Sequence, residues 1–225
     1  MITGISAQVK GPHQGQPLIA RGAPLASAQA AMVMVHGRGA TAQDILALTD
    51  ALMRPGIAYL APQAAGRQWY PNRFLSPIAS NEPWLSSALA SIGHAVSQAQ
   101  AHGIPKERIY LLGFSQGACL TLEFARREGG RFAGIFGLSG ALIGADDEFQ
   151  NQPAGALERT TVFLGCSESD EHIPSNRVLR SAEIFKNLGA SVTVRLYPGG
   201  GHMINADELD FIRSALFPAS ESKTP

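Results

Sequence analysis

The residues best suited to chemistry are a serine, an aspartate and a histidine that lie far apart in the chain. Ser115 stands at the centre of the sequence GFSQG, a G-x-S-x-G pattern. Asp170 lies in an acidic run over residues 167–174, and His202 follows three consecutive glycines. A serine hydroxyl is a poor nucleophile at neutral pH and needs an adjacent base, which a histidine oriented by a carboxylate can supply. The three residue types therefore suit nucleophilic attack on an acyl group.

The G-x-S-x-G pattern is short, so its interpretation depends on a strand before it and a helix after it. Residues 109–112 form an unbroken apolar run typical of a buried parallel strand, and residues 116–127 carry apolar residues at helical spacing. A serine at the tip of so tight a turn adopts a strained backbone, and a Cβ at either flanking glycine would clash. The amide N–H of Gln116 should then point at an oxyanion forming beside Ser115.

Strand and helix patterns alternate along the chain and predict a single α/β domain over residues 1–225. Strands are expected at residues 31–35, 57–61, 109–112, 133–138, 161–165 and 192–197. Helices are expected at residues 41–53, 84–101, 116–127, 176–188 and 206–216. This alternation predicts right-handed crossovers and a mostly parallel sheet with helices on both faces.

The remaining segments are expected to be irregular. Residues 1–29 are interpreted as a loosely structured N-terminal hairpin or loop, with weak strand candidates at 5–9 and 17–20, and residues 218–225 as a frayed tail. The linker over residues 139–160 is too short for a large lid domain, which predicts an open and shallow site.

In an open α/β sheet, ligands bind beyond the carboxyl ends of the strands. Ser115, Asp170 and His202 each follow a predicted strand, so we expect them to meet at one edge of the sheet. His202 would take the proton of Ser115, and Asp170 would hold the imidazole in the required tautomer. The backbone N–H groups of Gln116 and Arg38, the latter in the loop after strand 31–35, are the expected oxyanion donors.

A long irregular stretch over residues 63–83 contains several aromatic side chains, and loops of this length are usually functional or disordered. We expect Trp69, Tyr70, Phe74 and Leu75 to form the wall of the acyl or alcohol pocket, because the loop should lie over the same edge of the sheet. The alternative is that these side chains only cover a satellite core.

Other chemically capable residues have simpler interpretations. His36 is expected to hold the oxyanion loop by hydrogen bonds, without moving a proton. Cys119 and Cys166 are expected to be reduced core residues, since neither occupies the elbow position. Surface positions are expected for His13, His94 and His102. The acids near Asp170 are interpreted as a solvated acidic loop: Glu168, Glu171, Asp146 and Asp147.

Composition excludes several classes of function. Lysine and arginine together number 18, equal to aspartate and glutamate, and charged residues make up only 16% of the chain. Such a chain lacks the basic surface that nucleic acid or an anionic membrane requires. No apolar run approaches the ~18–20 residues that span a bilayer, and residues 1–30 do not resemble a signal peptide, so a cytoplasmic location is expected. The oligomeric state stays open, a homodimer included.

Two cofactor sites can be tested against the sequence. Residues 37–42 fit the G-x-G-x-x-A dinucleotide fingerprint, but the acidic residue required at the end of the next strand is missing after residues 57–61. No predicted helix carries paired histidine and glutamate at metal-binding spacing, so no metal is expected.

Read together, the motifs resemble the phospholipase/carboxylesterase group of α/β-hydrolases, which includes bacterial carboxylesterases and acyl-protein thioesterases. The matching stretches, which cover about residues 30 to 216, are HGRG at 36–39, WY at 69–70, GFSQGA at 113–118, DEHIP at 170–174 and GH at 201–202. The resemblance implies an α/β-hydrolase fold and cofactor-free hydrolysis of a small carboxylic ester or thioester by Ser115, Asp170 and His202. It also selects Asp170 among the neighbouring acids, because only Asp170 has the D-x-x-I-P context.

One position departs from the thioesterases of this group. They usually have an apolar residue where this chain has Arg38, followed by Gly-Asp, whereas Gly39 and Ala40 follow here. The departure favours the bacterial esterase branch, with short-to-medium acyl esters as substrates. The alternatives are a lysophospholipase or acyl-thioesterase that uses the same triad, and a catalytically idle ligand-binding hydrolase fold.

Overall fold

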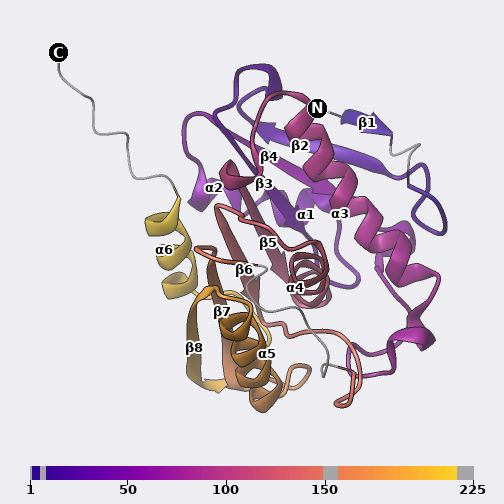
Figure 1. Cartoon of the computed structure of the whole chain (residues 1–225), viewed down its shortest axis with the longest axis vertical. Helices are drawn as coiled ribbons and strands as arrows, with labels where there is room; N and C mark the ends of the chain where they lie inside the picture. The colour runs from indigo at the N-terminus through magenta and orange to yellow at the C-terminus, as the bar shows by residue number, and fades with distance from the viewer. Residues whose placement is uncertain (1, 6–8, 149–156, 217–225) are drawn as a thin grey trace.

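The structure of the protein is a computed structural model, and it describes residues 2–5, 9–148 and 157–216. One eight-stranded sheet runs through the described residues in the order β1-β2-β4-β3-β5-β6-β7-β8 (Figure 1). The strands are β1 Ile2–Ile5, β2 Pro17–Gly22, β3 Ala30–Val35, β4 Ile57–Pro62, β5 Ile109–Phe114, β6 Gly134–Leu138, β7 Thr161–Ser169 and β8 Ser191–Gly200. Neighbouring strands in the part of the sheet ordered β4-β3-β5-β6-β7-β8 are all parallel, which confirms the predicted mostly parallel sheet.

Helices cover both faces of the sheet, as the alternating sequence pattern predicts. The α-helices are α1 Ala42–Leu46, α2 Thr49–Leu52, α3 Trp84–Ala101, α4 Gln116–Glu128, α5 Ser175–Asn187 and α6 Ala206–Ala215. The 3₁₀ helices are η1 Leu25–Ser27, η2 Ala65–Arg67, η3 Ile78–Asn81 and η4 Lys106–Arg108. Alternate residues of β3 point to opposite faces: Met32 joins the core beneath α1, α2 and α6, whereas Val33 joins the core beneath α3, α4 and α5.

The N-terminal segment is more ordered than expected. Strands β1 and β2 pair antiparallel, and β2 also pairs antiparallel with β4 over residues 18–22, so this hairpin extends the main sheet. Leu18 is buried on this strand, and Pro17 begins it, where a missing N–H is tolerated. The strand expected at 5–9 overlaps residues 6–8, which lie outside the described residues, as do residues 217–225.

The helix expected over residues 41–53 is divided into α1 and α2, separated at Ala47 and Leu48. Its N-terminus has a capping box: the hydroxyl of Thr41 accepts from the backbone N–H of Asp44, and the Asp44 carboxylate accepts from the N–H of Thr41 at 2.8 Å. Helix α1 is the next element after β3, so its capped start fixes the end of the loop that contains Arg38. Among the described helices, none is long and apolar enough to cross a bilayer.

The register of the last two strands explains how distant parts of the sequence meet. Strands β7 and β8 are longer than predicted, and Ser169 pairs with Gly200. The residues that follow, Asp170 and the loop that contains His202, therefore leave the sheet side by side. Ser115 leaves it from the end of β5, two strands away.

Candidate active site

Ser115 occupies a strained turn between β5 and α4, with φ 56° and ψ −124°. A Cβ at Gly113 would lie 2.3 Å from the carbonyl oxygen of Gly117, and a Cβ at Gly117 would lie 2.2 Å from that of Val35. Both contacts are with backbone atoms, which have little room to move, so each position requires glycine. The turn presents the serine Oγ at the carboxyl edge of the sheet.

His202 bridges Ser115 and Asp170. Its Nε2 lies 2.6 Å from Ser115 Oγ, and its Nδ1 lies 2.8 Å from Asp170 Oδ2. The imidazole also contacts two rings, Phe114 at 5.0 Å and His172 at 4.8 Å between centroids. Three side chains from three separate loops thus form one hydrogen-bonded chain that is suited to moving a proton away from the serine.

Asp170 is held by the loop that contains it. Its side chain is fully buried, and its Oδ1 accepts from the backbone N–H groups of His172, at 2.8 Å, and Ile173, at 3.0 Å. Burial alone would raise the pKa of Asp170, but the hydrogen bonds from His202 and from these two amides hold it below its usual value. The carboxylate therefore stays ionised at neutral pH and orients the imidazole.

The two expected oxyanion donors flank the serine. Gln116 is the first residue of α4, where amide N–H groups have no intrahelical acceptor. Arg38 lies in the loop after β3, next to Gly37, where a Cβ would come within 3.3 Å of the Cβ of Ser115. The loop therefore runs directly beside the serine, as a second donor requires.

His36 fastens that loop from below. It is fully buried, its Nδ1 lies 2.8 Å from the carbonyl oxygen of Gly37, and its Nε2 accepts from the N–H of Ala64 at 3.1 Å. A ring nitrogen that accepts from an amide carries no proton, so the imidazole is neutral and Nδ1–H donates. Burial lowers its pKa, which keeps it neutral. This geometry supports the expected holding role.

A feature that the sequence analysis missed is the side chain of Arg38. Its guanidinium donates to Gln68 Oε1 at 2.9 Å and to the backbone carbonyls of Tyr70, Pro71 and Asn72 at 2.8–3.2 Å. Gln116 binds the same segment, since its Oε1 accepts from the N–H of Trp69 and its Nε2 donates to the carbonyl of Tyr70. Two residues beside the serine therefore hold the 68–72 segment against the site, and no sequence motif indicates either contact.

The four expected pocket residues divide into two pairs. Tyr70 and Phe74 line the cavity beside Ser115, whereas Trp69 and Leu75 do not. Trp69 is fully buried, and its indole N–H donates to the carbonyl of His36 at 2.8 Å, so it packs beneath the loop. Leu75 packs against the core. The consecutive residues 70–74 line the cavity, and where this lining segment begins and ends could not be resolved from the aromatic content of the sequence.

The cavity measures about 640 Å³ and opens at the surface. Its lining comprises Arg38, Tyr70, Pro71, Asn72, Arg73, Phe74, Ser115, Gln116, Cys119, Glu171, His172, Ile173 and His202. Its walls therefore mix apolar and charged side chains, and the serine and histidine lie at its surface.

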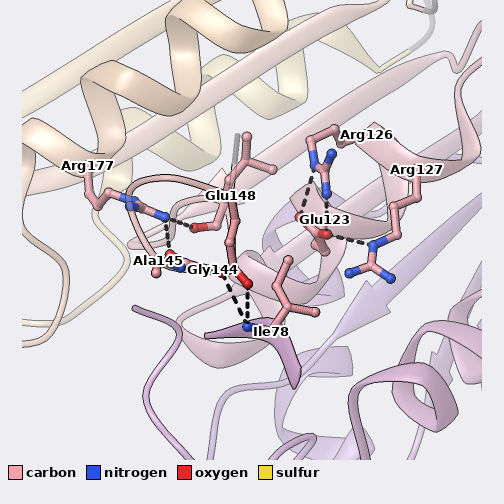
Figure 2. Close-up of polar contacts among 9 residues, drawn as sticks. Ile78, Glu123, Arg126, Arg127, Gly144, Ala145, Glu148 and Arg177 are labelled. Carbon is pink, nitrogen blue, oxygen red and sulfur yellow. Dashed lines mark hydrogen bonds and ion pairs between the residues drawn. The ribbon is translucent and has the colours of Figure 1, made fainter. Parts of the chain in front are cut away.

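Hydrogen bonds of Glu148 and Arg177 hold the segment that follows β6 (Figure 2). Glu148 accepts from the N–H of Ile78 at 3.0 Å and from that of Ala145, which joins the segment after β6 to the 63–83 loop. Arg177 of α5 donates to the carbonyl of Gly144 at 2.6 Å. Figure 2 also shows a buried carboxylate, Glu123, which is paired within α4. Its partners are Arg126 and Arg127.

The other histidines and the cysteines differ in their positions. His13, expected at the surface, is fully buried: its Nδ1 accepts from the N–H of Ala65, and its Nε2 lies 2.9 Å from the carbonyl of Trp69. The expectation was wrong because the Gly- and Pro-rich N-terminal segment has no periodic pattern that reveals burial. His94 is half-buried and His102 is exposed. Both cysteines are buried and free, as expected.

The acids that compete with Asp170 are exposed, and the hydrogen bond of His202 Nδ1 goes to Asp170. Glu168 and Glu171 are exposed, and Asp146 pairs with Arg177 and Arg180. Asp147 is also exposed. Within residues 2–5, 9–148 and 157–216, no group of three or more histidine, cysteine or acidic residues could hold a metal ion.

A serine on a strand-to-helix turn, followed in the chain by an aspartate and a histidine at the same edge of a mostly parallel sheet, defines the fold as that of an α/β-hydrolase. The sequence comparison narrows this class. The chain belongs to the Phospholipase/Carboxylesterase family, which it matches over residues 22–217.

Individual relatives agree with this assignment. The chain is 38% identical over 122 residues to acyl-protein thioesterase 1 of Gibberella zeae, covering 52% of each protein. It is 31% identical over 112 residues to lysophospholipase-like protein 1 of Mus musculus, covering 50% of this chain and 47% of the relative. The matches thus span about half the length of these curated relatives.

Among solved structures, a phospholipase/carboxylesterase from Dyadobacter fermentans superimposes with a TM-score of 0.87 at 39% identity. The match covers 92% of this chain and 99% of that one. SOBER1 of Arabidopsis thaliana superimposes with a TM-score of 0.70 at 21% identity, over 84% of this chain and 98% of that one, and shares the fold.

Proposed function

We propose that this protein is a serine carboxylesterase that hydrolyses short-to-medium acyl esters through an acyl-enzyme. The observation that carries the proposal is the continuous hydrogen-bonded chain from Ser115 Oγ through His202 to Asp170. Ser115 and His202 line a cavity whose size suits a small ester.

The proposed reaction has two halves. Ser115 Oγ attacks the ester carbonyl carbon while His202 Nε2 takes the hydroxyl proton, and the imidazolium then returns this proton to the departing alkoxide. Water next attacks the acyl-serine, again with His202 as base, and releases the acid and free Ser115. Asp170 stabilises the imidazolium in both halves, which its depressed pKa permits because the carboxylate remains ionised.

Each tetrahedral intermediate carries a negative oxygen, which the amide N–H groups of Gln116 and Arg38 would bind. Removing one such donor in a hydrolase costs about 2.7–4 kcal/mol of transition-state stabilisation. The side chain of Arg38 contributes indirectly, because its four hydrogen bonds hold the loop that flanks the serine.

Turnover of p-nitrophenyl acetate, butyrate, octanoate and palmitate by the purified protein tests the proposal. We expect the highest kcat/KM for the butyrate or octanoate, and loss of turnover in Ser115→Ala. A fluorophosphonate probe should label the wild type but not this variant. Wild-type turnover no faster than that of Ser115→Ala, together with an unlabelled Ser115, would overturn the proposal.

A thioester or lysophospholipid substrate is the second candidate, favoured by the names of the two curated relatives. The same serine chemistry would serve, so only the leaving group and the pocket discriminate. Matched butyryl oxyesters and thioesters, compared by kcat/KM, separate these activities. A catalytically idle fold would bind these esters without Ser115-dependent release of product.

A further inference from the structure

The cavity beside Ser115 has an uneven distribution of charge. Two arginines, Arg38 and Arg73, line it, against one carboxylate that faces solvent, Glu171. The carboxylate of Asp170 is fully buried behind His202 and does not line the cavity, so the excess of positive charge is that of the lining side chains. Because the whole chain has no net charge, this excess of positive charge is a local property of the cavity.

Neither arginine is neutralised by an acid among the described residues. Arg38 donates only to neutral oxygens, one of a side-chain amide and three of backbone carbonyls, so its charge remains. Arg73 is exposed, and its guanidinium has no hydrogen bond or ion pair within the part of the chain that the structure describes. An arginine in this state keeps its full set of donors for a ligand.

The backbone around Arg73 is nevertheless fixed on both sides. The N–H of Asn72 donates to Asn81 Oδ1 at 2.9 Å, and the carbonyl of Phe74 accepts from the N–H of Gly144 at 2.8 Å. The carbonyl of Arg73 itself accepts from the N–H of Ser76 at 3.0 Å. A free guanidinium therefore extends from an anchored backbone at the cavity wall, an arrangement that limits the ordering cost of binding.

We propose that Arg73, supported by the charge of Arg38, binds an anionic group on the ester substrate, so that the site prefers anionic esters to neutral ones. The inference rests on the proposed esterase function and names its substrate class. The planar fork of an arginine matches a carboxylate or phosphate in a bidentate arrangement. Glu171, on the loop after β7, contributes the opposite charge from a different segment of the wall.

The test uses pairs of esters in which one carboxylate is free in the first member and methylated in the second. Mono-p-nitrophenyl adipate has a free carboxylate on the acyl side, and p-nitrophenyl methyl adipate is its neutral partner. On the alcohol side, 4-carboxyphenyl hexanoate is compared with its methyl ester at the carboxyl group. The pair that shows the preference reveals which half of the substrate contacts Arg73.

We expect kcat/KM for the anionic ester of one pair to exceed that of its neutral partner by about tenfold, mainly through KM, as one charge-assisted hydrogen-bonded pair can provide. Arg73→Gln should bring this ratio close to one, and Arg73→Lys should retain part of it. Arg67→Gln removes an exposed arginine of the same loop that does not line the cavity, and should keep the wild-type ratio. Added NaCl should reduce the preference, since salt screens exposed charges.

Failure of the anion preference and failure of the esterase proposal give different results. Ser115-dependent turnover with no anionic preference, or with a preference that Arg73→Gln leaves intact, overturns this inference and leaves the esterase proposal standing. Absence of Ser115-dependent turnover overturns the esterase proposal. In that case, calorimetry on Ser115→Ala decides the anion preference: monomethyl adipate should bind more tightly than dimethyl adipate and lose this advantage in the Arg73→Gln background, and equal affinities would refute it.

Discussion

Replacing Asp170 by asparagine tests how His202 is oriented. In the wild type, Asp170 Oδ2 accepts from His202 Nδ1 at 2.8 Å, while Oδ1 accepts from two backbone amides. An asparagine of the same shape would keep its carbonyl oxygen on the two amides, because an N–H facing them would leave buried donors unpaired. Its NH₂ group would then face His202 and donate to Nδ1.

That exchange reverses the tautomer of the imidazole. With Nδ1 accepting, the proton moves to Nε2, which lies 2.6 Å from Ser115 Oγ and can no longer take the serine proton. In a serine hydrolase with this arrangement, the change lowers kcat by about 10⁴, equivalent to about 5.5 kcal/mol of barrier. We expect a loss of this size in Asp170→Asn with little change in KM.

The assay is the steady-state hydrolysis of p-nitrophenyl butyrate from pH 6 to 10, with thermal unfolding as the control for folding. Asp170→Ala is the matched comparison. Unlike asparagine, alanine leaves the two amides of the 172–173 segment without an acceptor, so this variant should unfold at a lower temperature. A kcat for Asp170→Asn within tenfold of the wild type, in a folded protein, would refute the reasoning about the tautomer.

Three further changes have outcomes that the structure specifies. Gly117→Ala places a Cβ 2.2 Å from the carbonyl oxygen of Val35 and should lower the free energy of unfolding in urea by more than about 3 kcal/mol. Gly15→Ala has open space around it and should lower this free energy by about 1 kcal/mol, because of its positive φ. Equal losses in the two variants would contradict the clash. Arg38→Ala should lower kcat/KM about tenfold by releasing the 68–72 segment, more than Arg38→Lys, and full activity in both would contradict the holding role. Burial raises the pKa of Glu208 from 4.5 to about 7, so the folded state holds this proton more tightly than the unfolded state, and stability should fall as pH rises from about 4.5 to 7. Glu208→Gln should remove this dependence on pH, and at pH 8 its free energy of unfolding should exceed that of the wild type by up to about 3 kcal/mol. The same dependence of the free energy of unfolding on pH in both proteins, measured by urea titration, would contradict this.

Much of the fold follows from patterns that the sequence contains. Unbroken apolar runs such as residues 31–35 predict buried parallel strands, because both faces of such a strand are covered and no alternation is needed. The capping box at Thr41 and Asp44 predicts a helix start from local hydrogen bonding alone. The N-terminal strands were predicted only weakly, because the place of β2 in the sheet depends on its pairing with β4, a contact that no local pattern encodes.

The site could be predicted as a set of residues but not as a shape. The elbow, the position of Asp170 and the glycines before His202 indicate three side chains at one edge of the sheet, since strand ends determine where loops begin. Which aromatic residues face the cavity depends on the path of the 63–83 loop. That path is held by side chains such as those of Arg38 and Gln116, through contacts that leave no spacing in the sequence.

The central claim is that Ser115 becomes acylated during turnover. Intact-mass spectrometry of protein quenched in acid during hydrolysis of p-nitrophenyl butyrate measures this directly, with peptide mapping to locate the adduct. The account predicts a butyryl group on the peptide that contains Ser115. Continued hydrolysis by Ser115→Ala, with the acyl group absent or attached elsewhere in the wild type, would contradict the account.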